Sequence, residues 1–270
     1  MVDLHTHIAE QSPDVLEAIA KAMEIRAAEP AMRAICARYM SAIGVPQGSR
    51  VLEVGCGNGA STKLLMKHLD PAELVGVDPA SAFIEMARRN FADEPRVSFH
   101  LGDAVRTGQP DASFDAVVAH TVYSHLPAPE EALKEAHRVL KPGGTLVVFD
   151  GDYATITVEL FEGDPLQAIV DIILRRLVHA PHIMRRLPRL ASRAGFSVTN
   201  VEPHGYLQTD TPDYLLTLIS RSADAAVKAG EFGEALAEGF TREAQRRIET
   251  GTFYGAIMFV SLTAMKPESA

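Results

Sequence analysis

The sequence predicts an α/β fold in which an open, mostly parallel sheet of seven strands is covered by helices on both faces, giving three layers. Between residues 50 and 149, five short apolar stretches alternate with segments of helical periodicity. Strands that are separated by helices of this length pair in parallel through right-handed crossovers. Two further apolar stretches near the C-terminus, at residues 196–201 and 253–265, complete the seven strands.

Two helices are expected before the first strand. Ser12 followed by Pro13 is typical of a helix start, because a hydroxyl can cap the helix and proline is tolerated at its first position. Apolar residues then recur at helical spacing until Pro30 breaks the run, and a second helix follows. A turn rich in glycine and proline at residues 44–48 ends this part. We therefore expect residues 1–48 to form a helical N-terminal extension or lid.

The alternation of strands and helices starts at residue 50. The last helix of this region is stopped by Lys141, Pro142, Gly143 and Gly144, because proline cannot continue a helix and glycine favours its end. The strands are expected at residues 50–54, 74–77, 97–101, 114–119 and 145–149, and the helices at residues 60–69, 80–91 and 129–140.

The pattern loosens after Asp150. Gly195 is well suited to the left-handed end of a helix. A helical and less apolar block lies between the two late strands, where we expect an insertion that packs over one end of the sheet. Residues 49–270 are therefore predicted to form one main domain with helical cap segments at about 155–190 and 211–250. Helices are expected at residues 166–178, 182–194 and 212–249.

Composition and charge argue against several classes of function. The 270 residues are 47% hydrophobic, which suffices for a packed core. A net charge of −9 and a pI near 5.6 oppose nucleic acid as a partner, because phosphate binding needs an excess of Lys and Arg. No apolar stretch reaches the roughly 18 residues that span a bilayer. Two cysteines and no signal-peptide pattern predict a cytoplasmic protein, and a homodimer is compatible with the sequence.

The strongest chemical signal is a glycine-rich turn between the first strand and its helix. Its sequence is Glu53-Val54-Gly55-Cys56-Gly57-Asn58-Gly59. Glycines allow a sharp turn and the close approach of a ligand, because they have no Cβ. The start of the next helix offers unpaired N–H groups to a polar ligand. The spacing also fits the loose dinucleotide fingerprint, so the turn predicts a nucleotide-like cofactor without choosing which one.

Acidic residues follow the next two strands. Asp78 ends the second strand, where a carboxylate can accept hydrogen bonds from both hydroxyls of a ribose. Asp78-Pro79 would also start the following helix well, and the two roles can coexist. Gly102-Asp103-Ala104 follows the third strand and places an acid where it can meet an adenine amino group.

With these motifs, the chain resembles the class I S-adenosylmethionine-dependent methyltransferases. Within them it is similar to the small-molecule group that includes the ubiquinone and menaquinone C-methyltransferases. The resemblance is strong over residues 50–150 and weaker afterwards. It implies a Rossmann-like sheet with a reversed last strand, S-adenosyl-L-methionine as cofactor, S-adenosyl-L-homocysteine as product and a small-molecule acceptor. The N-terminal extension and the block at residues 212–249 depart from the family pattern, and such variable parts usually cover the substrate.

The resemblance also implies roles for individual residues. The glycine-rich turn would contact the methionine part of the cofactor, Asp78 its ribose and Asp103 its adenine. His120, after the fourth strand, matches a position that commonly touches the methionyl end, and His125-Leu126-Pro127 resembles the His-Val-Pro segment of many members. The implied cofactor-binding residues are Glu53, Gly55, Cys56, Gly57, Asn58, Gly59, Asp78, Pro79, Gly102, Asp103, Ala104 and His120.

Methyl transfer needs few catalytic groups. It is an in-line displacement that depends on alignment, close approach and exclusion of water, and a base is needed only when a proton must leave the acceptor. Polar residues at the predicted rim of the sheet are the candidates, although each could instead be solvated or structural. These are His120, Tyr123 and Asp152 for catalysis, and Tyr153, His125 and Tyr206 for substrate binding. No metal site is expected, because His179 and His182 lack further ligands at a defined spacing.

Two other functions remain open at this point. A nicotinamide-dependent oxidoreductase uses a similar glycine turn, and Ala60 is allowed at its third small position, but the late strand pair gives it no support. A non-catalytic module that kept the cofactor fold is the second alternative, although the cofactor motif is intact. The sequence determines neither the acceptor nor whether an O, N or C atom is methylated.

Overall fold

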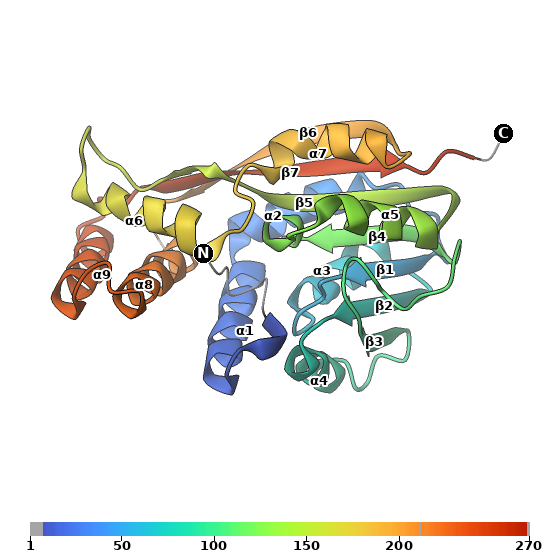
Figure 1. Ribbon diagram of the computed structural model, residues 1–270, viewed down its shortest axis with the longest axis horizontal. Helices are drawn as coiled ribbons and strands as arrows, with labels where there is room; N and C mark the ends of the chain where they lie inside the picture. The colour runs from blue at the N-terminus through green and yellow to red at the C-terminus, as the bar shows by residue number, and fades with distance from the viewer. Residues whose placement is uncertain (1–7, 211, 269–270) are drawn as a thin grey trace.

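The structure is a computed structural model that describes residues 8–210 and 212–268. One sheet of seven strands has the order β3-β2-β1-β4-β5-β7-β6. The pairs among β1 to β5 are parallel, whereas β7 runs antiparallel to both of its neighbours. Helices lie on both sides of this sheet (Figure 1). The predicted three-layer fold with a reversed last strand is thus confirmed. Residues 1–7 and 211, which belong to the predicted extension and cap, lie outside the described residues.

Strands and helices alternate along most of the chain. The strands are β1 (Arg50–Val54), β2 (Glu73–Asp78), β3 (Val97–Leu101), β4 (Phe114–His120), β5 (Leu140–Thr157), β6 (Ser197–Gln208) and β7 (Gly255–Met265). The α-helices are α1 (Pro13–Ala28), α2 (Pro30–Ser41), α3 (Ala60–Leu69), α4 (Ser81–Asn90), α5 (Pro129–Val139), α6 (Ala168–Ile172), α7 (Ile183–Arg193), α8 (Asp213–Lys228) and α9 (Glu234–Glu249). Short helical turns are η1 (Ile8–Glu10), η2 (Tyr123–His125), η3 (Pro165–Gln167) and the π-helical η4 (Ile173–Leu177).

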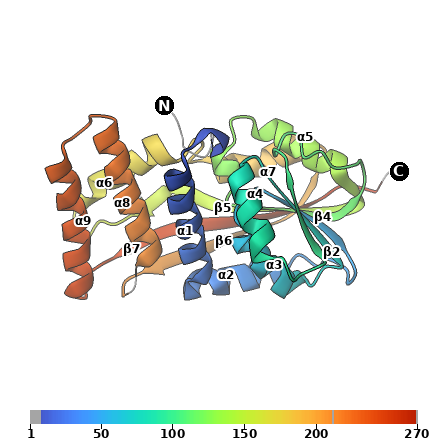
Figure 2. The same cartoon turned by 90° about the horizontal axis from the view of Figure 1, so that it is seen from below.

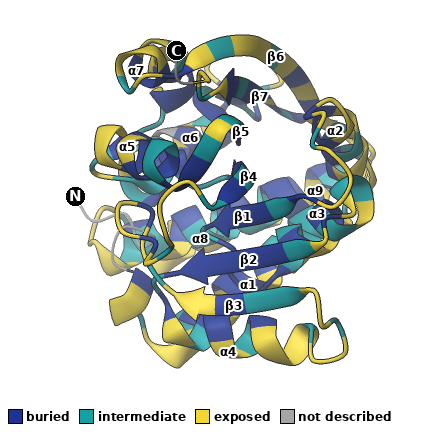
Figure 3. Ribbon diagram, turned by 90° about the vertical axis from the view of Figure 1, so that its right-hand side faces the viewer, coloured by how far each residue is buried: buried dark blue, intermediate teal, exposed yellow. Residues whose placement is uncertain are grey.

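Two apolar clusters cover the two faces of the sheet. On one face, α2 and α3 pack against Val51 and Phe149, and the cluster continues into α6 and α8. On the other face, α5 and α7 pack against Leu52 and Val117. Val51 and Leu52 point in opposite directions because side chains alternate along a strand. Strands β1 and β2 are therefore buried on both sides, as the dark-blue ribbons in Figure 3 show.

The two N-terminal helices form as the sequence predicts, but their caps differ. Helix α1 begins at Pro13, yet the Ser12 hydroxyl makes no capping hydrogen bond. Glu29 instead caps α2, because its carboxylate accepts a 2.9 Å hydrogen bond from the backbone N–H of Met32. Helix α1 lies between α4 and α8 (Figure 2). It therefore occupies the space between the cofactor-motif region and the C-terminal helices.

Strands β5 and β6 are longer than the sequence predicts, and β5 already includes the predicted helix-stopping residues 141–144, whereas β7 begins two residues later than predicted. The apolar pattern ends at residue 149, but strand β5 continues to Thr157 and pairs with β7 as far as Ala256. The polar run Asp150-Gly151-Asp152 resembles a loop in sequence, whereas an antiparallel neighbour satisfies its backbone groups as a strand. The predicted helix at residues 166–178 is also divided, into η3, α6 and η4. The extended strand pair carries the C-terminal helices beyond the parallel part of the sheet (Figure 1).

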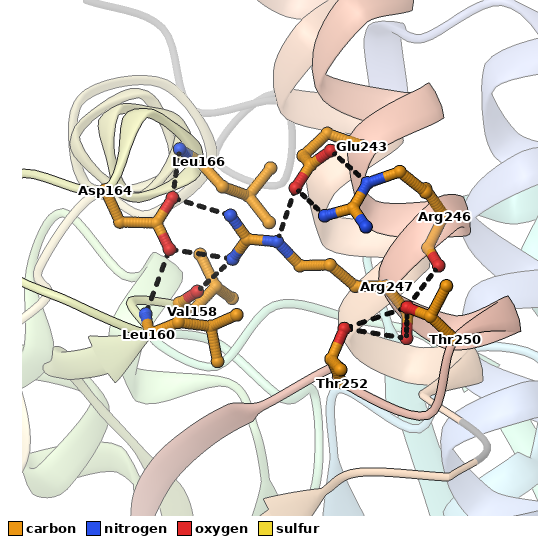
Figure 4. Close-up of polar contacts among 9 residues, drawn as sticks. All are labelled: Val158, Leu160, Asp164, Leu166, Glu243, Arg246, Arg247, Thr250 and Thr252. Carbon is orange, nitrogen blue, oxygen red and sulfur yellow. Dashed lines mark hydrogen bonds and ion pairs between the residues drawn. The ribbon is translucent and has the colours of Figure 1, made fainter.

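A buried ion pair joins the two predicted cap segments (Figure 4). Arg247 on α9 donates two hydrogen bonds of 2.7 Å to the carboxylate of Asp164, and both residues are 3% exposed. The same carboxylate accepts the backbone N–H groups of Leu160 and Leu166. The geometry is bidentate, which gives Arg–carboxylate pairs their directional strength. Among the helices of the described ranges, none combines the length and the apolar character that a membrane span requires.

Candidate active site

The carboxyl ends of β1, β2, β3 and β4 meet at one edge of the sheet. The strand order reverses between β1 and β4, and open α/β sheets bind ligands at such a point. A crevice of about 320 Å³ lies there, lined also by η1, α1 and the chain from η2 to Ala128. Of the predicted cofactor residues, the lining includes Gly55, Asp78, Pro79, Asp103 and Ala104.

The glycine turn is tightly closed. Gly55, Gly57 and Gly59 have φ values of 68°, 52° and 86°, which L side chains rarely adopt. A Cβ on Gly55 would also come within 2.5 Å of a methyl group of Val122. The N–H groups of Gly55 and Cys56 bond to the carbonyl of Val77, at 2.8 and 3.1 Å. The turn therefore uses these two N–H groups inside the protein.

Asp78 links the turn to the next strand. Its Oδ2 accepts the N–H of Gly57 and its Oδ1 accepts the N–H of Ala80, both at 2.9 Å. Asp78 therefore holds the turn before α4, but the N-cap of that helix is Ala80, so the predicted capping role of Asp78 is wrong. Each carboxylate oxygen keeps a further lone pair for a hydroxyl in the crevice. Burial raises the pKa of Asp78 to about 6, although the two backbone hydrogen bonds oppose the shift.

Glu53 lies beneath the turn and does not line the crevice. It is fully buried, and its two oxygens accept hydrogen bonds from the hydroxyls of Ser61 and Thr62, at 2.6 and 2.5 Å. Burial raises its pKa to about 7. The structure therefore places Glu53 where it holds the start of α3 against β1.

The other predicted cofactor residues surround the crevice without all facing it. Asn58 donates a 2.9 Å hydrogen bond to Glu24 of α1. A Cβ on Gly57 would lie 2.8 Å from the sulfur of Met23, also on α1, so the turn and α1 are in close contact. Gly102 is packed against the backbone of Thr107, where a Cβ would lie 2.9 Å from a carbonyl oxygen.

A small cavity of about 30 Å³ lies between the glycine turn and the end of β4. We call it the loop cavity; its lining includes Arg26, Cys56, Ser61 and His120. His120 forms a 2.7 Å hydrogen bond through Nδ1 with the Tyr39 hydroxyl. Burial and nearby Arg26 lower the pKa of His120 well below its ordinary value, so its imidazole is neutral near neutral pH.

A second cavity, of about 60 Å³, lies on the other side of Arg26. We call it the tyrosine cavity because Tyr153 of β5 and Tyr214 of α8 line it, together with apolar residues such as Leu218. Met23, Thr121 and His125 line both this cavity and the crevice. These three residues therefore form the shared wall between the two spaces.

Thr121 is held in an unusual conformation at this shared wall. Its φ of 58° is rare for a β-branched residue, and such strain is commonly found at functional sites. Three hydrogen bonds hold it: its N–H donates to Phe149, its hydroxyl donates to the carbonyl of His120, and Nη2 of Arg26 donates to the hydroxyl. Thr121 is thus held in a fixed position where the crevice, the loop cavity and the tyrosine cavity meet.

The structure does not bring the predicted catalytic residues together. Tyr123 is 2% exposed and packs in the apolar cluster beneath α5 and α7, and Asp152 pairs with Arg185 at 2.7 Å. Tyr206 also lies in the core, with its ring 5.8 Å from that of Tyr214. Of the residues predicted for catalysis or substrate binding, the three that line a cavity are His120, Tyr153 and His125.

Several residues at the site have no signal in the sequence pattern. Arg26 and Met23 belong to α1, and Tyr214 and Leu218 belong to α8. On helices of ordinary periodicity, these residues look like core or surface positions, and no motif marks them. Within the described part of the chain, no three His, Cys, Asp or Glu residues are grouped in a way that could hold a metal ion.

Comparisons with known proteins agree with this geometry. Residues 52–148 match the family described as methyltransferase domain. An uncharacterised 37.1 kDa transposon protein of Streptomyces fradiae is 32% identical over 194 residues, covering 71% of this chain and 56% of that protein. Demethylmenaquinone methyltransferase of Staphylococcus aureus is 35% identical over 122 residues, covering 45% of this chain and 51% of its own length. The chain thus spans about half the length of these curated relatives.

A solved structure extends the similarity to the whole fold. Phosphoethanolamine N-methyltransferase 2 of Haemonchus contortus, in complex with S-adenosyl-L-methionine, superposes with a TM-score of 0.62 and 16% identity. The match covers 99% of this chain and 61% of that chain. Residues 52–148 thus match the methyltransferase family that the sequence motifs predict, and the solved structure shares the fold.

Proposed function

We propose that this protein is an enzyme that transfers a methyl group from S-adenosylmethionine to a small-molecule acceptor, with the crevice as the cofactor site and the tyrosine cavity as the acceptor site. The methyltransferase domain supports the activity, and the similarity to a structure that holds this cofactor supports the cofactor. The crevice volume of about 320 Å³ falls within the range of roughly 300–1,000 Å³ that is usual for small-molecule sites. When bound, S-adenosylmethionine supplies an electrophilic methyl group on a positively charged sulfur.

The charge of the crevice is the main observation that favours S-adenosylmethionine as the cofactor. Within the described residues, its lining contains the carboxylates of Glu10, Asp78 and Asp103 and no Lys or Arg. A dinucleotide would bring its pyrophosphate to the glycine turn, where the N–H groups of residues 55–57 already bond inside the protein. An adenosyl sulfonium carries no phosphate, whereas the ribose acceptor that Asp78 would supply suits both cofactors. The crevice thus favours S-adenosylmethionine over a nicotinamide dinucleotide.

The shared wall is where methyl transfer would take place. Tight negative pairing at the sulfur would stabilise the starting state more than the transition state, so alignment and exclusion of water are the useful contributions. His125 is the titratable side chain on the shared wall and would accept a proton that must leave the acceptor. Burial raises the pKa of Asp150, and the charge of His125 opposes this shift.

Calorimetry with S-adenosylhomocysteine and with NADH tests the cofactor directly. We expect the wild-type protein to bind S-adenosylhomocysteine and not NADH. Asp78→Ala should weaken that binding by about tenfold or more, since hydrogen bonds to a charged group each contribute about 1.5–3 kcal/mol. Asp78→Asn, which keeps the shape and removes the charge, should weaken it as well.

The matched control is Asp93→Ala, which removes an exposed carboxylate after α4 and should leave the affinity unchanged. Melting curves of all variants show whether the fold survives the loss of the Asp78 hydrogen bonds. Binding of NADH without binding of S-adenosylhomocysteine would overturn the proposal in favour of an oxidoreductase. Tight S-adenosylhomocysteine binding with no methylation of any amine, phenol or carboxylic acid in a panel would indicate the non-catalytic module instead.

A further inference from the structure

Arg26 of α1 projects a partly buried guanidinium into the junction of the cavities. It lines both the loop cavity and the tyrosine cavity. Its Nη2 donates a 2.7 Å hydrogen bond to the Thr121 hydroxyl, and its guanidinium carbon lies 5.8 Å from the centre of the Tyr214 ring. Its Nε is buried and has no hydrogen-bond partner. A buried cation with an unused donor is costly unless a ligand completes it.

Arg247 is an example of a buried arginine whose charge is neutralised by carboxylates of the protein. Arg247 is buried as well, and its guanidinium contacts the carboxylates of both Asp164 and Glu243. Arg26 has no carboxylate within ion-pair distance among the described residues. A purely structural role for Arg26 would therefore leave its charge less well compensated than the charge of Arg247.

Arg26 is the positive group that is available to an anionic ligand in this part of the described structure. Within the described residues, Arg26 is the single Lys or Arg that lines the loop cavity, and the crevice beside it has none. His120, the other basic group of the loop cavity, is neutral near neutral pH because burial lowers its pKa. The N–H groups of Gly55, Cys56 and Gly57 are used inside the protein. A carboxylate that enters this cavity therefore finds its counter-charge on α1 rather than on the glycine turn.

We propose that Arg26 binds the carboxylate of the amino-acid tail of the cofactor, so that α1 forms one wall of the cofactor site instead of serving only as an extension or lid. This inference rests on the proposed function, because it needs an adenosyl cofactor in the crevice. The Nε and the terminal nitrogens of Arg26 form the planar donor set that suits a carboxylate. Thr121, which Arg26 holds, then lies between the tail and the acceptor.

Two ligands that differ in the tail test this role by calorimetry. S-Adenosylhomocysteine carries the carboxylate, and 5′-methylthioadenosine lacks the whole amino-acid tail. Arg26→Met should raise the Kd of S-adenosylhomocysteine by about tenfold or more and leave the Kd of 5′-methylthioadenosine unchanged. Arg26→Lys should keep part of the affinity, because it retains the charge without the planar donor pair.

The matched control is Lys21→Met, which removes an exposed cation from the same helix and should change neither affinity. Melting temperatures of the variants report whether α1 still packs. An unchanged Kd for S-adenosylhomocysteine in Arg26→Met overturns the inference, and so does an equal loss for both ligands, which would indicate a packing role. If Arg26→Met binds both ligands normally but methylates acceptors poorly, Arg26 serves the acceptor instead. If the wild-type protein binds neither ligand, the proposed function itself fails.

Discussion

Glu53 and Asp78 are carboxylic acids that the fold buries around the glycine turn. Burial raises the pKa of Glu53 to about 7 and the pKa of Asp78 to about 6, although each carboxyl accepts hydrogen bonds that act in the opposite direction. Both groups bind a proton more tightly in the folded protein than in the unfolded chain. Their contribution to the free energy of unfolding is fully present below the ordinary carboxyl pKa and is lost as the pH rises through the raised values.

Glu53→Gln tests this linkage in the free protein. Glutamine keeps the shape but cannot ionise, so the variant should gain stability relative to the wild type as the pH rises from about 5 to about 8. Urea unfolding at the two pH values measures the difference, with Glu85→Gln on the exposed side of α4 as the control. Parallel pH dependence of Glu53→Gln and the wild type would show that Glu53 is ionised in the folded protein.

His125 is the next residue whose role can be measured. If the acceptor must lose a proton, His125→Gln should lower kcat by about 10²–10⁴, the usual contribution of a positioned base. The Kd of S-adenosylhomocysteine should change far less than kcat, because His125 is only one of the residues that line the crevice. His100→Gln, on the exposed edge strand, is the control. An unchanged kcat would assign His125 to the structure of the wall alone.

Sequence analysis of individual residues succeeds where a motif fixes the backbone. Gly55 follows strand β1 directly and Asp78 ends strand β2, so their place at the edge of the sheet could be predicted. Tyr123 and Asp152 also follow strands or lie near their ends, but the direction of a side chain depends on pleat and packing, which turn them to the core and to Arg185. Arg26 could not be predicted, because its partners come from segments far along the chain.

At the scale of elements, the ion pair between Arg247 and Asp164 joins the two cap segments. Helix α9 and the turn before η3 are more than eighty residues apart in sequence and meet through this pair. Arg247 lowers the pKa of Asp164 to about 2, so the carboxylate stays charged over the physiological range. The pair therefore holds α9 against the end of the extended strand β5.

Arg247→Met should destabilise the protein by about 3–5 kcal/mol, because it leaves a buried carboxylate without its partner. The neighbouring substitution Arg246→Met removes an exposed partner of Glu243 and should cost about 1 kcal/mol or less. Chemical denaturation measures both values. The double variant Asp164→Asn with Arg247→Met should lose less than the sum of its single changes, and strict additivity would contradict the pairing.

Hydrophobic periodicity predicts some of the helices and strands and misses others. The parallel strands and their helices can be predicted within a few residues, because buried strands and amphipathic helices have distinct periods. The predicted strand β5 is too short, since Asp150 and Asp152 look like loop residues until an antiparallel partner is known. The division of residues 165–177 into three helical turns also has no signal in the periodicity.

At the scale of the whole molecule, the tyrosine cavity is assembled from parts that are remote in sequence. Helix α1, the extended part of β5, the chain at η4 and helix α8 all contribute to it. The crevice, in contrast, is formed largely by the ends of consecutive strands. The proposed cofactor site could therefore be predicted from local motifs, whereas the proposed acceptor site depends on how the cap folds onto the domain.

Leu218→Trp should separate the two sites. The larger side chain would fill a cavity of about 60 Å³, so the KM for an acceptor should rise by about tenfold or more while the Kd of S-adenosylhomocysteine is unchanged. The acceptor is the compound that the wild-type protein methylates fastest in a panel. Leu236→Trp, on an exposed position of α9, is the control. A variant that loses cofactor affinity instead would show that the two spaces are one site.

The long antiparallel strands β6 and β7 allow the cap segment between them to change in sequence and length while the sheet is kept. The segment at residues 209–254 leaves and rejoins the sheet at the same end, between Gln208 and Gly255, whereas the segment after Thr157 crosses to the opposite end, where Ser197 of β6 pairs with Met265. We expect replacements between Gln208 and Gly255 to change the α8 wall of the tyrosine cavity and to leave the register of β6 and β7 intact. A chimera that exchanges only residues 209–254 is therefore expected to change the proposed acceptor site and to keep the proposed cofactor site.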